Sequence, residues 1–548
     1  MLRAWEDQGI TTLLPIQRKA IEAGCLSGRN LLVLGPTSCG KTFVGEIAAV
    51  KNALAMKRTL YLVPFKALAE EKHAEFRQKY GGAGIGAEVL ISTADRRDDD
   101  RRLPDGDFHI AILTYEKLSA LLVYGPSILD GLGTVVIDEV QMIGDETRGA
   151  ELELLVTRIR QVAPRLQLLG LSAAVSELNG FDTWLGATVV RDESRPVPLR
   201  EGVVVPSGEF TYVQWRDENR RDGTERLPAV QGNSHEDLGT ALVSEMLREP
   251  NAQILVFVSS VRATQEYAQA VAQRAAFLAP AAEAKRAIAA LEQTESTEQL
   301  ARMLDRSVAF HNADLTIEER LAVEAGFRAG TIRCIVSTST LSMGVNLPAS
   351  TVVIAEHTKW SRNAGGWGRP PITVAEYRNM SGRAGRFGLK TDSFGRSVLI
   401  AESALRREAL MNQYINAVPE PLESAFLKQP LDVRVLRVIA SGLAPNIGRL
   451  RGFLLATFAA TRLWTTRAAR TEMCKELDRV VDDLCAKELV STQAGGGLSV
   501  TPLGRVCAAS GLRVATFDRI RSLATSGNQS IIDLVLIASQ CDDTGPDV

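Results

Sequence analysis

The sequence predicts an α/β protein built from two parallel-sheet lobes followed by a mainly helical C-terminal part. Seven strand-like apolar runs alternate with helical patterns between about residues 15 and 190, and five more follow between about residues 252 and 401. Such alternation is typical of a parallel sheet covered by helices. Beyond about residue 405 the strand rhythm is lost, and the apolar residues recur mainly with helical spacing.

The first apolar run leads into a glycine-rich motif. The segment NLLVLGPTSCGKTFVGE (30–46) fits G-x-x-x-x-G-K-S/T, a phosphate-binding loop between a strand and a helix. In such a loop the backbone N–H groups surround phosphate, the lysine reaches the β- and γ-phosphates, and the hydroxyl holds Mg²⁺. Gln17 lies upstream, and its amide is suited to the edge of adenine. The predicted ATP-binding residues, one of them from the second lobe, are Gln17, Gly35, Pro36, Thr37, Ser38, Cys39, Gly40, Lys41, Thr42 and Gly344.

Two acidic residues end a later strand of the first lobe. The run VVIDEVQMI places Asp138 and Glu139 where the strand end faces the phosphate-binding loop. Asp138, together with Thr42, is predicted to hold Mg²⁺, and Glu139 to orient and deprotonate the attacking water. Ser172 follows another apolar strand, and we predict that its hydroxyl bonds to Gln141 and reports phosphate release.

The second lobe contains a pair of arginines among small residues. In YRNMSGRAGRFG (377–388), Arg383 and Arg386 are three positions apart, which places them on one face of a helix. A guanidinium aimed at the γ-phosphate from a neighbouring lobe stabilises the transition state as an arginine finger. The predicted catalytic residues are Lys41, Asp138, Glu139, Gln141, Arg383 and Arg386.

Composition restricts the class of protein. Of 548 residues, 45% are hydrophobic and 23% are charged, and the net charge is −2. Any nucleic-acid surface must therefore be a local groove rather than the whole protein. No apolar stretch reaches the roughly 18 residues of a membrane span, and the N-terminus lacks a signal-peptide core, so we expect a cytoplasmic protein. Seven scattered cysteines without C-x-x-C spacing argue against a disulfide framework and against a zinc site.

Three further segments have distinct compositions. Residues 194–235 are rich in proline, glycine and charge, and we predict a linker there. Residues 274–304 are rich in alanine, glutamate and leucine, which predicts a helical arm inserted into the second lobe. Near the C-terminus a helix pair precedes a hairpin-like stretch, LVSTQAGGGLSVTPLGR (489–505). That order is consistent with a winged helix and equally with an ordinary helical cap.

Taken in order, these blocks resemble the motifs of superfamily 2 helicases, specifically the Ski-like group. The matching blocks are GPTSCGKT, VPFKALAEEK, TYEKL, DEVQ, LSAAV, FVSS, STSTLSMGVNLPA and NMSGRAGR. Longer phrases such as AFHNADLTIEERLAVEAGFRAGTIRCIVSTSTL are similar to the HelQ-type DNA repair helicases. The likeness runs from about residue 10 to residue 515.

The resemblance implies an ATP-dependent 3′–5′ helicase that acts on single-stranded or forked DNA. It implies two RecA-like lobes, residues 1–195 and 196–404, that bind ATP and Mg²⁺ between them. It also implies a winged helix over 405–512 and the opening of a helical ratchet-like domain over 513–548. In this group a hairpin between the last two motifs splits the strands, and here that span is 357–377.

Several side chains are assigned to nucleic-acid binding. Lys66 and Thr114 follow strands and are suited to phosphate contacts near helix N-termini. Tryptophans in the hairpin span are suited to stacking on the last base pair, although packing between the lobes is the alternative. The assigned residues are Lys66, Thr114, Ser172, Thr338, Trp360 and Trp367.

Other functions remain open at this stage. An RNA helicase of the same group is one alternative, and an ATP-binding subunit that clamps DNA for a nuclease, as in phage defence, is another. A protein partner that completes or regulates the motor is also expected. Two positions depart from the family pattern: Gln141 replaces the usual histidine and Ala174 the usual threonine. We hypothesise that a Gln141–Ser172 contact re-tunes the coupling of hydrolysis to unwinding.

Overall fold

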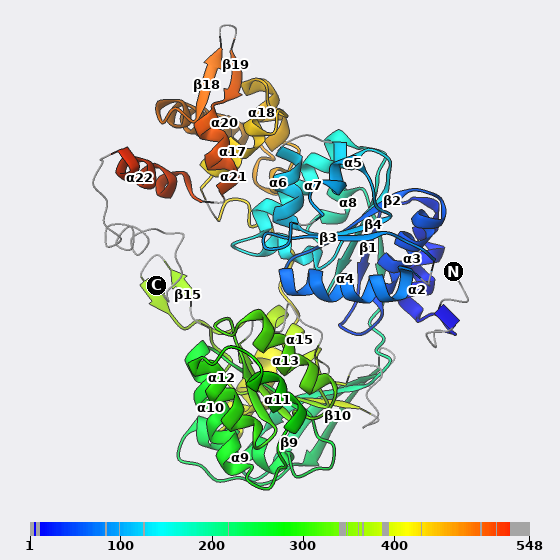
Figure 1. The fold of residues 1–548 in the computed structure, drawn as a ribbon, viewed down its shortest axis with the longest axis vertical. Helices are drawn as coiled ribbons and strands as arrows, with labels where there is room; N and C mark the ends of the chain where they lie inside the picture. Colours follow the sequence, from blue (N-terminus) through cyan, green and yellow to red (C-terminus); the bar gives the residue numbers. More distant parts are fainter. Residues whose placement is uncertain are drawn as a thin grey trace.

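Two α/β lobes and a C-terminal unit make up the protein (Figure 1). The computed structural model describes residues 5–6, 11–82, 85–97, 99–123, 127–216, 219–338, 347, 349–359, 361–363, 366–385, 394–428, 430–493, 496–510 and 512–525. Among these residues, no helix combines the length and the apolar character that a membrane crossing would need.

Lobe 1 is a seven-stranded parallel sheet in the order β3-β4-β2-β5-β6-β1-β7. Its strands are β1 (Leu31–Leu34), β2 (Arg58–Val63), β3 (Val89–Ser92), β4 (Ile110–Thr114), β5 (Leu132–Ile137), β6 (Gln167–Ser172) and β7 (Thr188–Arg191). Its helices are α2 (Pro15–Glu22), α3 (Lys41–Leu54), α4 (Lys66–Tyr80), α5 (Arg102–Asp105), α6 (Tyr115–Val123), α7 (Gly149–Val162) and α8 (Phe181–Leu185), with short turns η1 (Cys25–Ser27), η2 (Ser127–Leu129) and η3 (Val140–Gly144). The central strands are buried along their length because helices cover both faces, as their near-continuous apolar sequences predict.

Lobe 2 is an eight-stranded sheet in the order β10-β9-β8-β17-β14-β11-β13-β12. Its strands are β8 (Leu199–Val204), β9 (Glu209–Arg216), β10 (Asn219–Arg226), β11 (Ile254–Val258), β12 (Val308–His311), β13 (Cys334–Thr338), β14 (Thr351–Ile354) and β17 (Gly395–Ile400). Its helices are α9 (His235–Met246), α10 (Val261–Arg274), α11 (Ala282–Ala289), α12 (Glu295–Leu304), α13 (Ile317–Arg328), α15 (Val374–Ser381) and α16 (Ala404–Leu410), which runs into the π-turn η4 (Met411–Ile415). Side-chain caps such as Thr316 and Thr373, each in a capping box, begin many of these helices. The two predicted parallel-sheet lobes are therefore confirmed.

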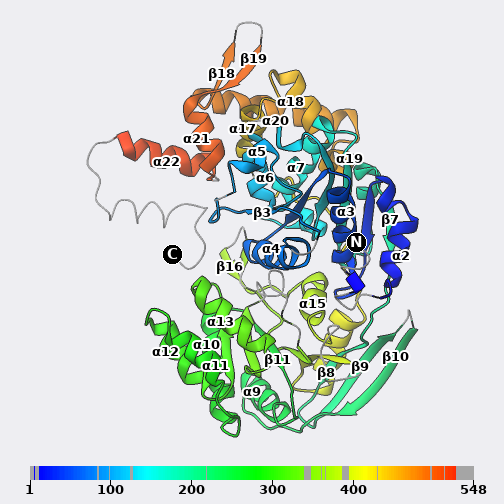
Figure 2. The ribbon, with the colours of Figure 1, turned by 45° about the vertical axis from the view of Figure 1, so that its right-hand side comes forward.

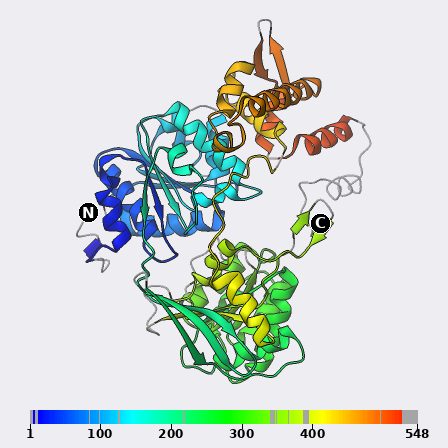
Figure 3. The same cartoon turned by 180° about the vertical axis from the view of Figure 1, so that it is seen from behind.

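The prediction of a linker over 194–235 is wrong for much of its length. Three strands, β8, β9 and β10, lie there, and they extend the sheet of lobe 2 (Figure 2). Strand β8 joins β17 in parallel, and β9 and β10 follow as an antiparallel hairpin at the edge. The hairpin escapes detection because its outer strand, NRRDGTER, is polar throughout and has no neighbour beyond it to bury an apolar face. Seen from behind, these strands form the outer border of the lobe (Figure 3).

The predicted helical arm over 274–304 contains helices α11 and α12, but they do not form a separate arm. Ile288, Leu300 and Leu304 are buried in the main core of lobe 2. The two helices therefore belong to the layer that covers the sheet. Helical periodicity was sufficient to predict these helices, but it does not say where an amphipathic helix docks.

The C-terminal unit combines helices with one hairpin. Its elements are α17 (Asp432–Ala440), α18 (Ile447–Leu454), α19 (Phe458–Leu463), α20 (Arg467–Ala486), β18 (Val490–Gln493), β19 (Gly497–Val500), α21 (Pro502–Ser510) and α22 (Val514–Thr525). The predicted hairpin is present, as β18 and β19 pair antiparallel. A bridge between Asn446 and Gly497 ties the hairpin back to the start of α18.

The C-terminal unit packs on lobe 1 through helix α7 (Figure 1). Ala150 and Leu154 of α7 are buried in the core of the C-terminal unit, while Leu422 and Phe458 are buried in the core of lobe 1. Each part therefore completes the core of the other.

Glu153 of α7 lies in this interface and makes stability depend on pH. Its carboxylate accepts the N–H of Ala459 at 2.7 Å and the hydroxyl of Ser424 at 2.5 Å. Burial raises the pKa of Glu153 to about 7, and these hydrogen bonds oppose the rise. A pKa raised above its unfolded value stabilises the folded protein below the unfolded pKa, and this stabilisation is lost as the pH rises through about 7.

We therefore expect the melting temperature of the parent protein to fall by a few degrees between pH 5 and pH 8. A Glu153→Gln variant should keep an acceptor for the Ala459 N–H and lose most of this pH dependence. The free energy of unfolding that the parent loses over this pH range, and that the variant should keep, is about 2–3 kcal/mol. Thermal melts of both proteins across this pH range test the prediction, and parallel curves would contradict it.

Candidate active site

The phosphate-binding loop joins strand β1 to helix α3 at the carboxyl end of the lobe 1 sheet. Ser38 and Gly40 adopt left-handed backbone conformations, with φ of 70° and 94°. The Lys41 ammonium donates to the carbonyls of Gly35 at 2.6 Å and Pro36 at 2.8 Å. The loop therefore folds around a cation at the start of a helix, where a phosphate group is favoured.

The glycines of the loop fit a bound phosphate chain because side chains have no room there. A Cβ at Gly35 would lie 2.8 Å from the carbonyl oxygen of Asp192 and 2.8 Å from the sulfur of Cys39. A Cβ at Gly40 would collide with the amide nitrogen of Gln17. Both backbones are thus held close to their neighbours. Thr42 begins helix α3 beside them, where its hydroxyl is suited to hold Mg²⁺.

Gln17 is buried against the loop rather than lying on the surface. Its Oε1 accepts the N–H of Leu14 at 2.9 Å, and its Nε2 donates to the carbonyl of Gly40 at 3.2 Å. An amide group has two donors and two acceptor positions, so one of each remains after these bonds. Contact with adenine therefore stays a prediction, and bracing the phosphate-binding loop is an added role.

Asp138 and Glu139 follow strand β5. Strand β6 separates β5 from β1, so the carboxylates lie at the same edge of the sheet as the phosphate-binding loop. Asp138 accepts the N–H of Glu139 at 3.0 Å and the hydroxyl of Tyr61 at 3.1 Å. Burial raises the pKa of Asp138 to about 6, and the Glu139 charge adds to the rise, while Lys72 and Lys41 oppose it. A bound divalent cation would favour the ionised form of this buried acid.

Glu139 is held in an unusual backbone conformation. Its φ is 52°, in the left-handed region that non-glycine residues rarely adopt. The hydroxyl of Tyr115 bonds to the preceding carbonyl, that of Asp138. Strain of this kind clusters at functional sites and persists where the surroundings enforce it. Here it turns the Glu139 side chain toward Gln141, whose Nε2 donates to the Glu139 carboxylate.

The predicted hydrogen bond between Gln141 and the Ser172 hydroxyl is wrong. Gln141 does contact the loop after β6, but at the next residue, Ala173. Gln141 Oε1 accepts the backbone N–H of Ala173 at 3.2 Å. The Ser172 hydroxyl instead donates to the carbonyl of Ala173 at 2.9 Å. The long glutamine amide reaches the backbone directly, so the serine is not needed as its partner. Gln141 thus links the Glu139 carboxylate to the loop after β6.

This link predicts an effect of restoring histidine at position 141. A Gln141→His variant cannot present an amide's adjacent donor and acceptor to Glu139 and Ala173, so the two loops should couple differently. If ATP hydrolysis by this chain drives duplex unwinding, as the resemblance implies, we expect a change of about threefold or more in base pairs unwound per ATP hydrolysed, with a smaller change in nucleotide affinity. Parallel measurement of hydrolysis and strand displacement tests this expectation. An unchanged ratio would reject a coupling role for Gln141.

Arg383 reaches this site from lobe 2. It follows helix α15 and is only 7% exposed. Burial lowers its pKa to about 10, and the carboxylates of Glu71 and Glu139 in lobe 1 oppose this lowering. At the preceding residue, a Cβ on Gly382 would lie 2.8 Å from the Cβ of Thr37 in the phosphate-binding loop. The two lobes therefore meet beside the phosphate-binding loop, and the charges of Glu71 and Glu139 act on the Arg383 guanidinium there. Arg386 and Gly344 lie outside the described residues.

The residues assigned to nucleic-acid binding differ in their exposure to solvent. Lys66, at the start of α4, is exposed and pairs with Asp95 at 2.7 Å. Thr114 is buried and caps the next helix by accepting the N–H of Lys117 at 3.3 Å. Ser172 is also buried, and its carbonyl accepts the N–H of Gly35 at 3.2 Å. Ser172 thus lies beside the phosphate-binding loop rather than on an open surface.

The remaining assigned residues lie near the hairpin span or the end of β13. Thr338 is the last residue of β13 and is buried. The hairpin expected within 357–377 is present as β15 (Ser361–Asn363) and β16 (Gly366–Gly368), which project from lobe 2 (Figure 1). Trp367 lies on β16, and Trp360 is outside the described residues.

Two groups at the site were missed from the sequence. Tyr61, which donates to Asp138, lies in the middle of an apolar run on β2, and only the pairing of β2 with β5 brings it close to Asp138. Arg195, in the segment between the lobes, donates to the carbonyl of Thr37 at 3.4 Å. The hydroxyl of Tyr61 inside an apolar strand is the one sequence signal that could have identified it.

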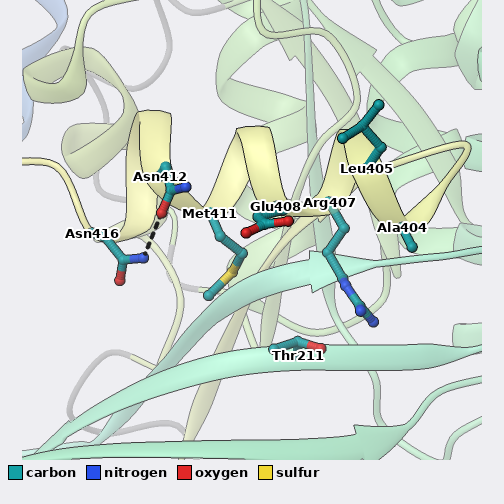
Figure 4. Close-up of a pocket in the computed structure, with 8 residues that line it drawn as sticks. All are labelled: Thr211, Ala404, Leu405, Arg407, Glu408, Met411, Asn412 and Asn416. Carbon is teal, nitrogen blue, oxygen red and sulfur yellow. Dashed lines mark hydrogen bonds between the residues drawn. The ribbon is translucent and has the colours of Figure 1, made fainter.

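A hollow of about 510 Å³ lies in lobe 2 (Figure 4). Strand β9 forms its floor and helix α16 with η4 forms its wall. It is lined by Thr211, Ala404, Leu405, Arg407, Glu408, Met411, Asn412 and Asn416. These residues include none of the predicted nucleotide ligands, so the hollow is distinct from the candidate active site.

Comparison with known proteins agrees with this geometry. The DEAD/DEAH box helicase family matches residues 14–180, and the helicase conserved C-terminal domain matches residues 238–388. The first match contains the phosphate-binding loop with Asp138 and Glu139, and the second contains Arg383.

Three curated relatives are each named ATP-dependent DNA helicase Hel308. The chain is 38% identical to that of Pyrobaculum calidifontis, over 85% of this chain and 63% of the relative. It is 34% identical to that of Caldivirga maquilingensis, over 91% and 64%, and 35% identical to that of Methanocella arvoryzae, over 91% and 65%. The chain thus spans a little less than two thirds of the length of these relatives. With two RecA-like lobes, both helicase domains and these relatives, the chain belongs to the Ski-like group of superfamily 2 helicases.

Proposed function

We propose that this chain is the motor of an ATP-dependent 3′–5′ DNA helicase that acts on single-stranded or forked DNA. The observation that supports it most is the meeting of the two lobes at one site. Gly382 of lobe 2 lies against Thr37 of the phosphate-binding loop, and the neighbouring Arg383 is buried within the electrostatic influence of Glu71 and Glu139 of lobe 1. A motor needs such a site because closing the lobes on a nucleotide converts hydrolysis into relative motion.

Each residue has a defined part in the proposed hydrolysis. Lys41 and the loop N–H groups bind the phosphate chain, and Thr42 with Asp138 would hold Mg²⁺, which supplies positive charge to the phosphates when bound. Glu139 orients a water and accepts its proton. Arg383, together with Arg386, stabilises the charge that develops on the transferred phosphoryl group.

The proposed DNA path follows from elements around this site. The β15–β16 hairpin would separate the two DNA strands. Lys359, just before the hairpin, pairs at 2.7 Å with Glu376 of α15, which we call the arginine helix because it leads to Arg383. For the predicted span 405–512, we propose that the winged helix is formed by the C-terminal unit from α17 onward, because residues 405–415 pack in the core of lobe 2. We propose that residues 513–548 begin a ratchet-like domain. We place the lobe boundary at 195/196. Action in repair, fork processing or phage defence, a cytoplasmic location and a regulating protein partner belong to the same proposal.

Strand displacement on a 3′-tailed DNA fork, with and without ATP and Mg²⁺, tests the proposed function. Unwinding that requires both, together with ATP hydrolysis stimulated by single-stranded DNA, is the expected result. A 5′-tailed fork is the control for polarity. A fork with an RNA tail separates a DNA motor from an RNA motor. Binding without displacement would favour a DNA-clamping subunit and overturn the helicase proposal.

A further inference from the structure

One short segment touches both lobes at the edge of the active site. We call residues 419–426 the strap. It leaves lobe 2 after η4 and leads to the C-terminal unit. Between Glu420 and Ala425 it bonds first to helix α15, which precedes Arg383, and then to the two loops of lobe 1 that follow Asp138–Glu139 and Ser172–Ala174.

Glu420 attaches the strap to lobe 2. Its carboxylate accepts the N–H of Val374 at 2.7 Å and the N–H of Ala375 at 2.9 Å. These are the first two residues of α15, where N–H groups have no partner within the helix. The helix already has a capping box from Thr373, so Glu420 is a second cap supplied from another part of the chain.

The next residues attach the strap to lobe 1. The N–H of Leu422 donates to the carbonyl of Glu177 at 2.8 Å, and Asn179 Nδ2 donates to the carbonyl of Leu422 at 3.1 Å. The N–H of Ala425 donates to the carbonyl of Ile143 at 3.1 Å. The Leu422 side chain is buried in the core of lobe 1. This half of the strap is therefore fixed to lobe 1 just beyond Gln141 and Ala174.

Helix α15 is consequently held at both ends. Its first turn is bonded to Glu420, and beyond its last turn Gly382 lies against Thr37 of the phosphate-binding loop. From these contacts we infer that Glu420 is a positioning residue. Through the strap, it fixes the position of helix α15, and so of Arg383, relative to lobe 1. The inference rests on the proposed function, because it assigns Glu420 a part in the same hydrolysis.

The helix has an anchor of its own, so removal of Glu420 should leave the fold intact. Arg378 pairs with Glu201 of β8 at 2.6 Å, and Ser381 donates to the same carboxylate at 2.9 Å. Glu423 is exposed in the same strap and provides a matched control. The test compares Glu420→Ala, Glu420→Gln and Glu423→Ala with the parent protein.

Two measurements are made on each full-length variant. Hydrogen exchange of the peptide that contains Val374 and Ala375 reports the cap, and steady-state ATP hydrolysis with single-stranded DNA reports positioning. For Glu420→Ala we expect faster exchange in that peptide and about a fivefold lower kcat, with little change in KM or melting temperature. Glu420→Gln, which keeps one acceptor oxygen, should fall between parent and alanine, and Glu423→Ala should match the parent.

Unchanged exchange, or an unchanged kcat despite faster exchange, would overturn the inference. An equal loss in Glu423→Ala would also overturn it. A parent protein without DNA-stimulated hydrolysis would instead overturn the proposed function. In that case hydrogen exchange still tests the contact between Glu420 and α15. Unchanged protection of the α15 amides in Glu420→Ala would show that the strap does not hold this helix.

Discussion

Replacement of Glu139 by glutamine should lower kcat for ATP hydrolysis by about 10²–10³-fold. The amide has the shape of the carboxylate but cannot accept a proton from water, and a positioned general base contributes in this range. Gln141 can still bond to the substituted side chain, so the left-handed turn at position 139 should persist. Nucleotide binding should therefore change little. Steady-state hydrolysis and binding of a fluorescent ATP analogue test the two parts of this prediction.

The same variant should alter the pH dependence of metal-dependent nucleotide binding. Negative charge on Glu139 is one of the causes that raise the pKa of Asp138 to about 6. In the parent, binding should weaken as the pH falls through about 6, because protonated Asp138 is a poor ligand for Mg²⁺. Loss of the Glu139 charge lowers the pKa of Asp138, so the weakening should move to lower pH. A Glu283→Gln variant, on the outer helix α11 of lobe 2, should behave like the parent. Full hydrolysis by Glu139→Gln would exclude Glu139 as the base.

Replacement of Arg383 by alanine should lower kcat by about 10³-fold, the range of an arginine finger. Arg383 is buried, and its guanidinium is under the influence of the Glu71 and Glu139 charges of lobe 1. The loss should appear in kcat more than in KM, because the charge that Arg383 meets develops in the transition state. Arg383→Lys should recover little activity, since an ammonium cannot reproduce the planar fork of the guanidinium.

Arg262→Ala controls for loss of an arginine in lobe 2. Arg262 is exposed on α10 and pairs with Glu266 of its own helix at 2.7 Å. Its variant should hydrolyse ATP at the parental rate. If Arg383→Ala retained parental kcat while folding normally, the lobes would not share one active site, and the proposed motor would lose its main support.

The local chemistry of the site was predictable from the sequence, but several of its contacts were not. The phosphate-binding loop and the Asp138–Glu139 pair were predicted because each depends on neighbouring residues and on a strand that ends beside them. The Gln141–Ser172 bond was predicted one residue away from the observed contact with Ala173. Motif spacing indicates which loops meet, whereas side-chain reach and backbone direction determine which atoms bond.

Larger errors came from segments whose structure depends on distant partners. Residues 194–235 are polar and rich in turn-forming residues, yet β8 to β10 form there because the sheet of lobe 2 offers an edge for pairing. Tyr61 can donate a hydrogen bond to Asp138 only because β2 and β5 are neighbours in the sheet. The strap escaped notice because Glu420 acts through backbone N–H groups, which carry no sequence signature.

Residue order alone therefore specified the two α/β lobes, the nucleotide loop, the acidic pair and the arginines, because each arises from short-range periodicity or from a fixed run of side chains. Three-dimensional packing was needed to bring Arg383 to Glu139, to fix the C-terminal unit on α7 and to let one strap bond to both lobes. These contacts join residues tens to hundreds of positions apart. Their geometry follows from how sheets and helices pack, which no local pattern encodes.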